Sequence, residues 1–166
     1  MQFAEALEKL EKSAEFRDWK KENVDSYISC GFLVIDGDQM REWQIGYYNK
    51  VRDTITNFVI GDNDIEIGEA SDVFKEENTT VKKLELSEVK LNLSQALEAA
   101  LKVKNDKYMQ EIVIKKIILL QNLEKYGNIW NVTFVTKAFK TLNIKINAND
   151  GAVLEDGIIS VIEFEK

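Results

Sequence analysis

Cysteine is the only conventional soft nucleophile in this sequence, and it occurs once, as Cys30. A cysteine attacks as its thiolate, which usually needs a histidine or another nearby cation to form near neutral pH. The chain contains no histidine, and Cys30 lies in an apolar stretch, residues 28–32, that is typical of a strand. The pattern therefore favours a buried structural thiol over a catalytic one.

Two short acidic segments have the side chains that a divalent cation prefers. Asp36 and Asp38 flank a glycine, and three acids alternate between Asp62 and Glu66. Neither segment has the full twelve-residue loop of an EF-hand or the glutamate that closes it. The spacing leaves cation binding open but favours ordinary polar turns.

Other sources of chemistry are missing. The eight glycines are scattered, so that neither a phosphate-binding loop nor a dinucleotide fingerprint can be assembled. No pair of acids stands out for carboxylate-pair hydrolysis, and no histidine is present to shuttle protons near neutral pH. The sequence therefore predicts a protein that is not an enzyme, with no catalytic residue, no metal site and no cofactor.

Aromatic and basic residues provide one candidate interaction surface. Tyrosine, tryptophan and arginine dominate protein interfaces, and Arg41, Tyr48 and Lys50 lie on or beside a predicted strand. We expect these three side chains on its wet face. The alternating aromatic residues of this strand and of a second one like it are predicted to be core: Trp43, Tyr47, Trp130 and Phe134.

Composition limits the partners. The net charge is −7, from 29 acidic and 22 basic residues, with no basic stripe, so nucleic acid is not an expected partner. The longest apolar run, residues 112–120, is interrupted by two lysines and is too short to span a membrane. The N-terminus lacks the basic start and apolar core of a secretory signal. It predicts either a cytoplasmic protein or an extracytoplasmic one whose leader has been removed.

The chain has an internal similarity. Residues 41–50 align with residues 128–137 at an offset of 87, which pairs Trp43 with Trp130. Upstream, residues 3–8 are similar to residues 93–98. Self-similarity of this kind predicts a duplicated unit, with a first repeat over 1–87 and a second over 88–166.

Periodicity predicts the elements of each repeat. Apolar residues recur at helical spacing near residues 3–10, 16–19 and 93–101. Strands are expected by alternation and composition over 27–35, 43–47, 81–86, 130–134, 142–146 and 157–165. Turns are expected at 36–38 and 149–151. The predicted fold class is α+β: two tandem repeats, each a helix packed on a curved antiparallel sheet of about four strands.

The second half resembles the PepSY domain family. The resemblance depends on the aromatic-led strand at 129–134 and on the alternating strand and turn at 142–154, with the helix at 93–101 in the place of the family's alanine-rich helix. Asn147 stands where the family usually has an acid, and Asp150 where it usually has a threonine. The resemblance implies a helix cradled by a curved sheet, without catalytic residues, that binds or inhibits other proteins.

Two functions follow as hypotheses. The first is a non-catalytic protein-binding or regulatory module with tandem PepSY-like units, with inhibition of its partner as one role. The partner is another protein, and a homodimer is compatible with this hypothesis. The alternative is a cystatin-like or nuclear-transport-factor-like domain that binds a small apolar ligand between helix and sheet. Large inward-facing residues on the predicted strands favour a packed interior and hence the first hypothesis.

Overall fold

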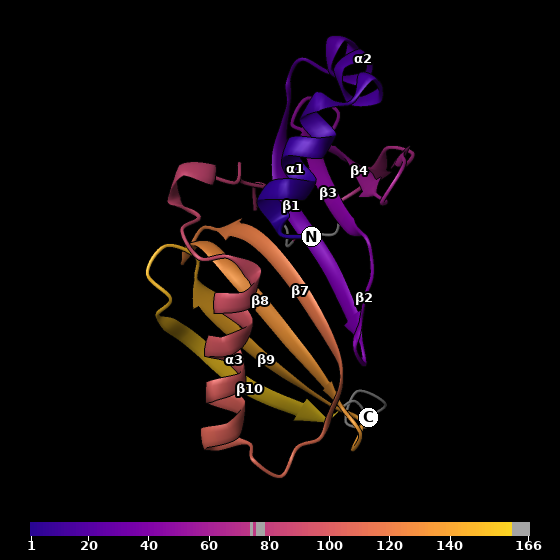
Figure 1. Cartoon of the computed structure of the whole chain (residues 1–166). Coiled ribbons are helices and arrows are strands. Elements are labelled where there is room, and N and C mark those ends of the chain that lie inside the picture. Colours follow the sequence, from indigo (N-terminus) through magenta and orange to yellow (C-terminus); the bar gives the residue numbers. More distant parts are fainter. Residues whose placement is uncertain (74, 76–78, 161–166) are drawn as a thin grey trace.

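The strands of the described residues all belong to one antiparallel sheet (Figure 1). The computed structural model describes residues 1–73, 75 and 79–160. Eight strands lie side by side in the order β10-β9-β8-β7-β1-β3-β4-β5, while β2 pairs with β1 and β6 pairs with β4. The strands are β1 (Ser26–Asp36), β2 (Gln39–Met40), β3 (Trp43–Asn49), β4 (Thr54–Ile60), β5 (Ile65–Ile67), β6 (Ser71–Asp72), β7 (Val113–Leu123), β8 (Gly127–Thr136), β9 (Lys140–Asn147) and β10 (Val153–Ser160).

Within the described residues, three α-helices accompany the sheet: α1 (Phe3–Lys12), α2 (Ala14–Glu22) and α3 (Leu93–Lys107). Helix α1 contacts β3 and β4, whereas α3 contacts β8, β9 and β10. Each of the last two helices begins at a capping side chain: Ser13 accepts a hydrogen bond from the amide of Phe16, and Asn92 accepts one from the amide of Gln95. The three helices predicted from apolar spacing are therefore confirmed.

The junction of β1 and β7 contradicts the predicted fold class. These two eleven-residue strands pair from Cys30 opposite Gln121 to Asp36 opposite Lys115, so one ladder runs across the middle of the sheet. The prediction of two separate helix-on-sheet repeats is wrong, because a long open strand edge in each half is satisfied by pairing with the other. The boundary predicted between residues 87 and 88 stays a prediction.

The segment between the two halves is not the strand that its composition predicts. Residues 81–86 have no strand assignment and lead into a single 3₁₀ turn, Leu86–Glu88. Leu84 is fully buried, and its amide donates to the carbonyl of Ile28 at 2.9 Å, beyond the point where β1 stops pairing with β7. The side chain of Asn128 donates to the carbonyl of Glu85 and accepts from its amide, both at 3.2 Å. The segment therefore fills the end of the β1–β7 junction.

One core lies between the helices and the sheet. The predicted alternation is confirmed in both tryptophan strands, where Trp43, Ile45 and Tyr47 and then Trp130, Val132 and Phe134 are buried. The rings of Trp43 and Trp130 lie 6.4 Å apart between centroids, so the two halves share their largest side chains. Gly31 lets α1 approach closely, because a Cβ there would overlap the ring of Phe3.

Two predicted turns are also confirmed. Gly37, between β1 and β2, has φ +60°, and Gly151, between β9 and β10, has φ +77°, a conformation that favours glycine. The last strand differs from its prediction over 157–165: it begins earlier, at Val153, and the structure describes it to Ser160, with residues 161–166 outside the described part.

Candidate functional site

In the part of the chain that the structure describes, the helices lie over one face of the sheet, and the other face is here called the open face. Successive side chains of a strand point to opposite faces of the sheet. Leu33 and Ile118 are buried on the helix side, so their neighbours along each strand point to the open face. The eight strands in line make this face roughly 34 Å wide at the usual strand spacing.

Four apolar side chains form the apolar centre of the open face: Phe32, Val34, Ile117 and Leu119. All four are partly exposed. Phe32 lies opposite Leu119, and Val34 lies opposite Ile117, so they are cross-strand neighbours on β1 and β7. A solvent-facing side of an antiparallel sheet is usually polar, and an apolar centre is therefore unexpected on a face that has no helix over it in the described residues.

Polar side chains flank the apolar centre. On the β8 side, the amide nitrogen of Asn143 donates to Asn131 Oδ1 at 2.6 Å and to Thr133 Oγ1 at 2.9 Å. On the β3 side, Gln44 is opposite Phe32, and β4 follows it. An apolar centre with a polar rim is the usual anatomy of a protein interface.

Tyr48, predicted to be exposed, lies toward one end of this face but is only 2% exposed. Its ring packs edge-on against Tyr27 with centroids 5.6 Å apart, and Lys75 Nζ lies 5.8 Å from its centroid. Its hydroxyl donates to Asp53 Oδ1. Burial, and then the Asp53 carboxylate, raise the pKa of Tyr48. Tyr48 is packed against these neighbouring side chains, and the expectation that its side chain is exposed is wrong.

Arg41 and Lys50 are exposed as predicted, but they lie at opposite ends of β3. A seven-residue strand separates them by more than about 20 Å. The structure therefore does not gather Arg41, Tyr48 and Lys50 into one patch.

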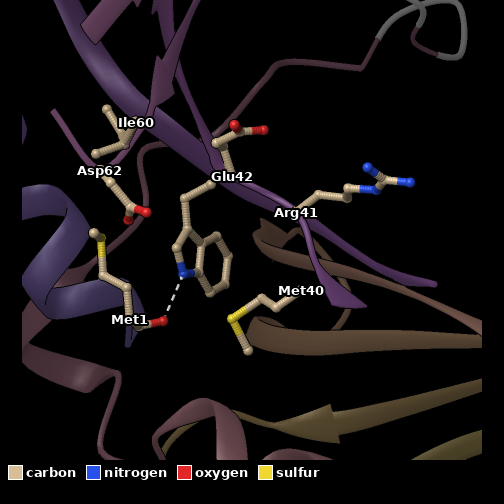
Figure 2. A pocket seen from close by; sticks show the side chains of 7 residues that line it. Met1, Met40, Arg41, Glu42, Ile60 and Asp62 are labelled. Carbon is tan, nitrogen blue, oxygen red and sulfur yellow. Dashed lines mark hydrogen bonds between the residues drawn. The ribbon is translucent and has the colours of Figure 1, made fainter. Parts of the chain in front are cut away.

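Arg41 borders a pocket of about 310 Å³ at the edge of the helix side (Figure 2). The pocket is also lined by Met1, Met40, Glu42, Trp43, Ile60 and Asp62. Figure 2 shows the Arg41 guanidinium pointing away from Met1 and Asp62. The indole nitrogen of Trp43 donates to the Met1 carbonyl at 3.1 Å. No convergent set of polar groups is formed by the residues drawn there.

A second hollow, the outer groove, lies at the Tyr48 end of the open face and has a volume of about 540 Å³. Its lining includes Cys30, Ile55, Leu119 and Leu123. Burial raises the pKa of the Cys30 thiol, so the thiol is kept in its unreactive form. Cys30 contributes surface to the groove rather than a nucleophile.

Basic side chains of the protein itself contact both acidic turns. Asp36 lies 3.6 Å from Lys115 Nζ and 4.0 Å from the Arg41 guanidinium. In the other turn, Lys9 Nζ donates to the carbonyls of Gly61 and Asp62. Among the described residues, no three His, Cys, Asp or Glu side chains gather as metal ligands would.

The open face was not predicted from the sequence, although the sequence contains a pattern that indicates it. In β1 and β7, apolar residues occupy consecutive positions, as in residues 31–35 and 117–120, so that they point to both faces of the sheet. Such runs indicate a strand that is apolar on both faces. Only the pairing of β1 with β7 shows that the two runs are neighbours.

The fold places this chain among α+β proteins in which helices cover one side of a broad antiparallel sheet. A crystal structure of a presumed lipoprotein from Clostridium difficile 630 is similar, with a TM-score of 0.58 and 18% sequence identity over 87% of this chain and 90% of that one. That likeness shows a shared fold. No protein family matches the sequence, and no curated protein matches it, so the PepSY resemblance stays a prediction. No helix in the described residues is long and apolar enough to span a membrane.

Proposed function

We propose that this protein is a non-catalytic binding module that holds another protein on the open face of its sheet. The observation that carries the proposal is the apolar centre, Phe32, Val34, Ile117 and Leu119, partly exposed on paired strands and flanked by polar side chains. A stable interface needs about 800 Å² from each partner, and a sheet of this width offers that area. Regulation or inhibition of the partner stays a prediction.

A photo-crosslinking amino acid in place of Ile117 tests the proposal in cells of the native host. A control chain carries the same amino acid in place of Leu101, an exposed apolar residue on α3. We expect a discrete crosslinked protein from position 117 and none from position 101. The crosslink should disappear with Leu119→Lys, which puts a charge into the apolar centre. Circular dichroism must show that each variant is folded, and equal crosslinking from both positions would overturn the proposal.

The outer groove favours a second candidate, a small apolar ligand. Its volume lies within the range of about 300–1,000 Å³ that is usual for ligand pockets. The position differs from the one expected from sequence, because the space between the helices and the sheet is filled by core side chains. Native mass spectrometry of protein purified from its host would show a small molecule that unfolding releases, and Leu123→Glu should abolish its binding.

A further inference from the structure

Four large apolar side chains are exposed together at one end of the sheet, away from the open face. They form the apolar tip: Met109 is 78% exposed, Ile112 62%, Ile114 48% and Phe139 69%. They come from the loop after α3, the start of β7 and the turn between β8 and β9, which Figure 1 shows at the same end of the molecule. Exposed apolar residues that cluster in this way mark a binding surface rather than random surface variation.

The loops of the apolar tip are held in place. The amide of Lys137 donates to the carbonyl of Ile112 at 2.8 Å, which joins the β8–β9 turn to the start of β7. Beneath them, Lys140 Nζ lies 2.7 Å from Glu111 Oε1, and this glutamate is buried. A buried carboxylate is costly unless it is paired, so the pair fixes the two loops against each other. The apolar side chains are therefore presented on a rigid base.

Phe139 is also held in an unfavourable conformation, with φ +56°. A bulky residue with a positive φ is rare, and asparagine or glycine would occupy this position at lower cost. The sequence places instead a large aromatic ring, most of which is in water. Neither backbone geometry nor packing within the chain accounts for that choice.

Positive charge surrounds the apolar tip, although the whole chain carries −7. In the described residues, Lys116 and Lys137 have no ion-pair partner, and Lys104 Nζ donates to the carbonyl of Met109. Three nearby carboxylates are matched: Glu111 by Lys140 and Asp156 by Lys107, both at 2.7 Å, and Asp36 by Lys115 at 3.6 Å. Asp38 lies in the turn whose Gly37 amide donates to the carbonyl of Ile114, and it has no ion pair in the described residues. The charge left without a partner around these loops is therefore mainly cationic.

We propose that the apolar tip docks on an anionic lipid surface, with Met109, Ile112, Ile114 and Phe139 entering the headgroup region and the lysines contacting lipid phosphates. Exposed apolar side chains combined with lysine are what interfacial binding requires, and each lysine near an anionic surface strengthens binding. The docking is peripheral and needs no membrane-spanning helix. It is independent of the open face, which lies on a different side of the molecule.

Co-sedimentation of the full chain with vesicles tests this proposal. Vesicles of phosphatidylcholine mixed with phosphatidylglycerol should retain the protein, and vesicles of phosphatidylcholine alone should retain much less, with binding that weakens as salt rises. Phe139→Asn removes the ring and suits the positive φ, so folding is preserved. We expect it to weaken binding about tenfold, and Lys137→Gln to weaken it about fivefold.

Val51→Asn is the matched control, because Val51 is 81% exposed in the turn after β3, far from these loops. It should bind vesicles as the unchanged protein does. Equal retention of Phe139→Asn and the unchanged protein would overturn the proposal. So would sedimentation velocity showing that the apolar tip joins two copies of the chain, with Phe139→Asn converting a dimer into a monomer without any vesicle binding.

Discussion

Trp43 and Trp130 meet across the middle of the core, with ring centroids 6.4 Å apart. Each indole also donates a hydrogen bond to a carbonyl two residues before a helix: Trp43 to Met1, before α1, and Trp130 to Leu91, before α3. The two rings therefore tie the start of each helix to the sheet and to each other. This relationship makes the core a shared structure of both halves.

We expect Trp43→Phe and Trp130→Phe each to lower the free energy of unfolding by about 1–3 kcal/mol, because each loses ring volume and leaves a carbonyl without its donor. Urea unfolding followed by circular dichroism and by fluorescence would measure this. Both probes should report one transition in the unchanged protein and in each variant. Two separate transitions, each sensitive to only one substitution, would contradict a shared core.

Gly31→Ala is expected to destabilise the protein by about 1–3 kcal/mol, because the new methyl group would overlap the buried ring of Phe3. Gly157→Ala is a matched control within a strand, since a Cβ there meets nothing within 4 Å, and it should change stability little. The melting temperatures of the two variants provide the comparison. Adding Phe3→Leu to Gly31→Ala should recover part of the loss, and a failure to recover would place the strain elsewhere.

Asn128→Ala should cost about 0.5–1.5 kcal/mol, because the buried side chain of Asn128 loses its hydrogen bonds with the amide and the carbonyl of Glu85. Asn149→Ala, at an exposed turn, is the control and should have almost no effect. Hydrogen exchange offers a second measurement: faster exchange of the Glu85 amide is expected in Asn128→Ala. An unchanged exchange rate would show that the side chain does not protect this amide.

The ion pair between Lys107 and Asp156 predicts how stability depends on pH. Hydrogen bonds from Lys107 and then from Tyr108 lower the pKa of Asp156 in the folded protein. Between that lowered pKa and the unfolded value of about 4, the unfolded chain binds a proton that the folded chain does not. Asp156 therefore adds to the free energy of unfolding above about pH 4, and this stabilisation is lost as the pH falls below that value.

Asp156→Asn should lower the free energy of unfolding at neutral pH and approach the unchanged protein in acid. Urea unfolding at neutral pH and near pH 3 checks this. Asp38→Asn is a suitable control, because Asp38 is exposed and forms no ion pair within the described residues. A constant difference between Asp156→Asn and the unchanged protein at both pH values would show that the pair does not titrate with folding.

Local patterns predicted the helices and most of the long strands, but they indicated a strand at 81–86 that does not form and gave no bounds for β4 or β7. Apolar spacing located all three helices, and the period of two identified the buried residues of the tryptophan strands, because both depend only on neighbours along the chain. The joining of β1 to β7 could not be predicted in this way. Pairing across a long sequence separation depends on which strand edges meet, and the sequence of either strand alone is compatible with a separate sheet.

The candidate surfaces show the same limit. Arg41 and Lys50 were correctly placed near solvent, yet Tyr48 is covered by Tyr27 and Lys75, which lie far from it in sequence. The apolar centre of the open face and the apolar tip each need residues from at least two separate segments. Neither could be recognised before the sheet order was known.

The β1–β7 pairing has a consequence for the kinetics of folding. Its partners lie about 80 to 90 positions apart, whereas the hairpins on either side join residues close in sequence. Closing so long a loop costs chain entropy before any contact repays it, and proteins rich in such contacts fold slowly. The outer hairpins can therefore form first, and the central ladder, with Leu84 closing its end, is expected to complete the sheet last.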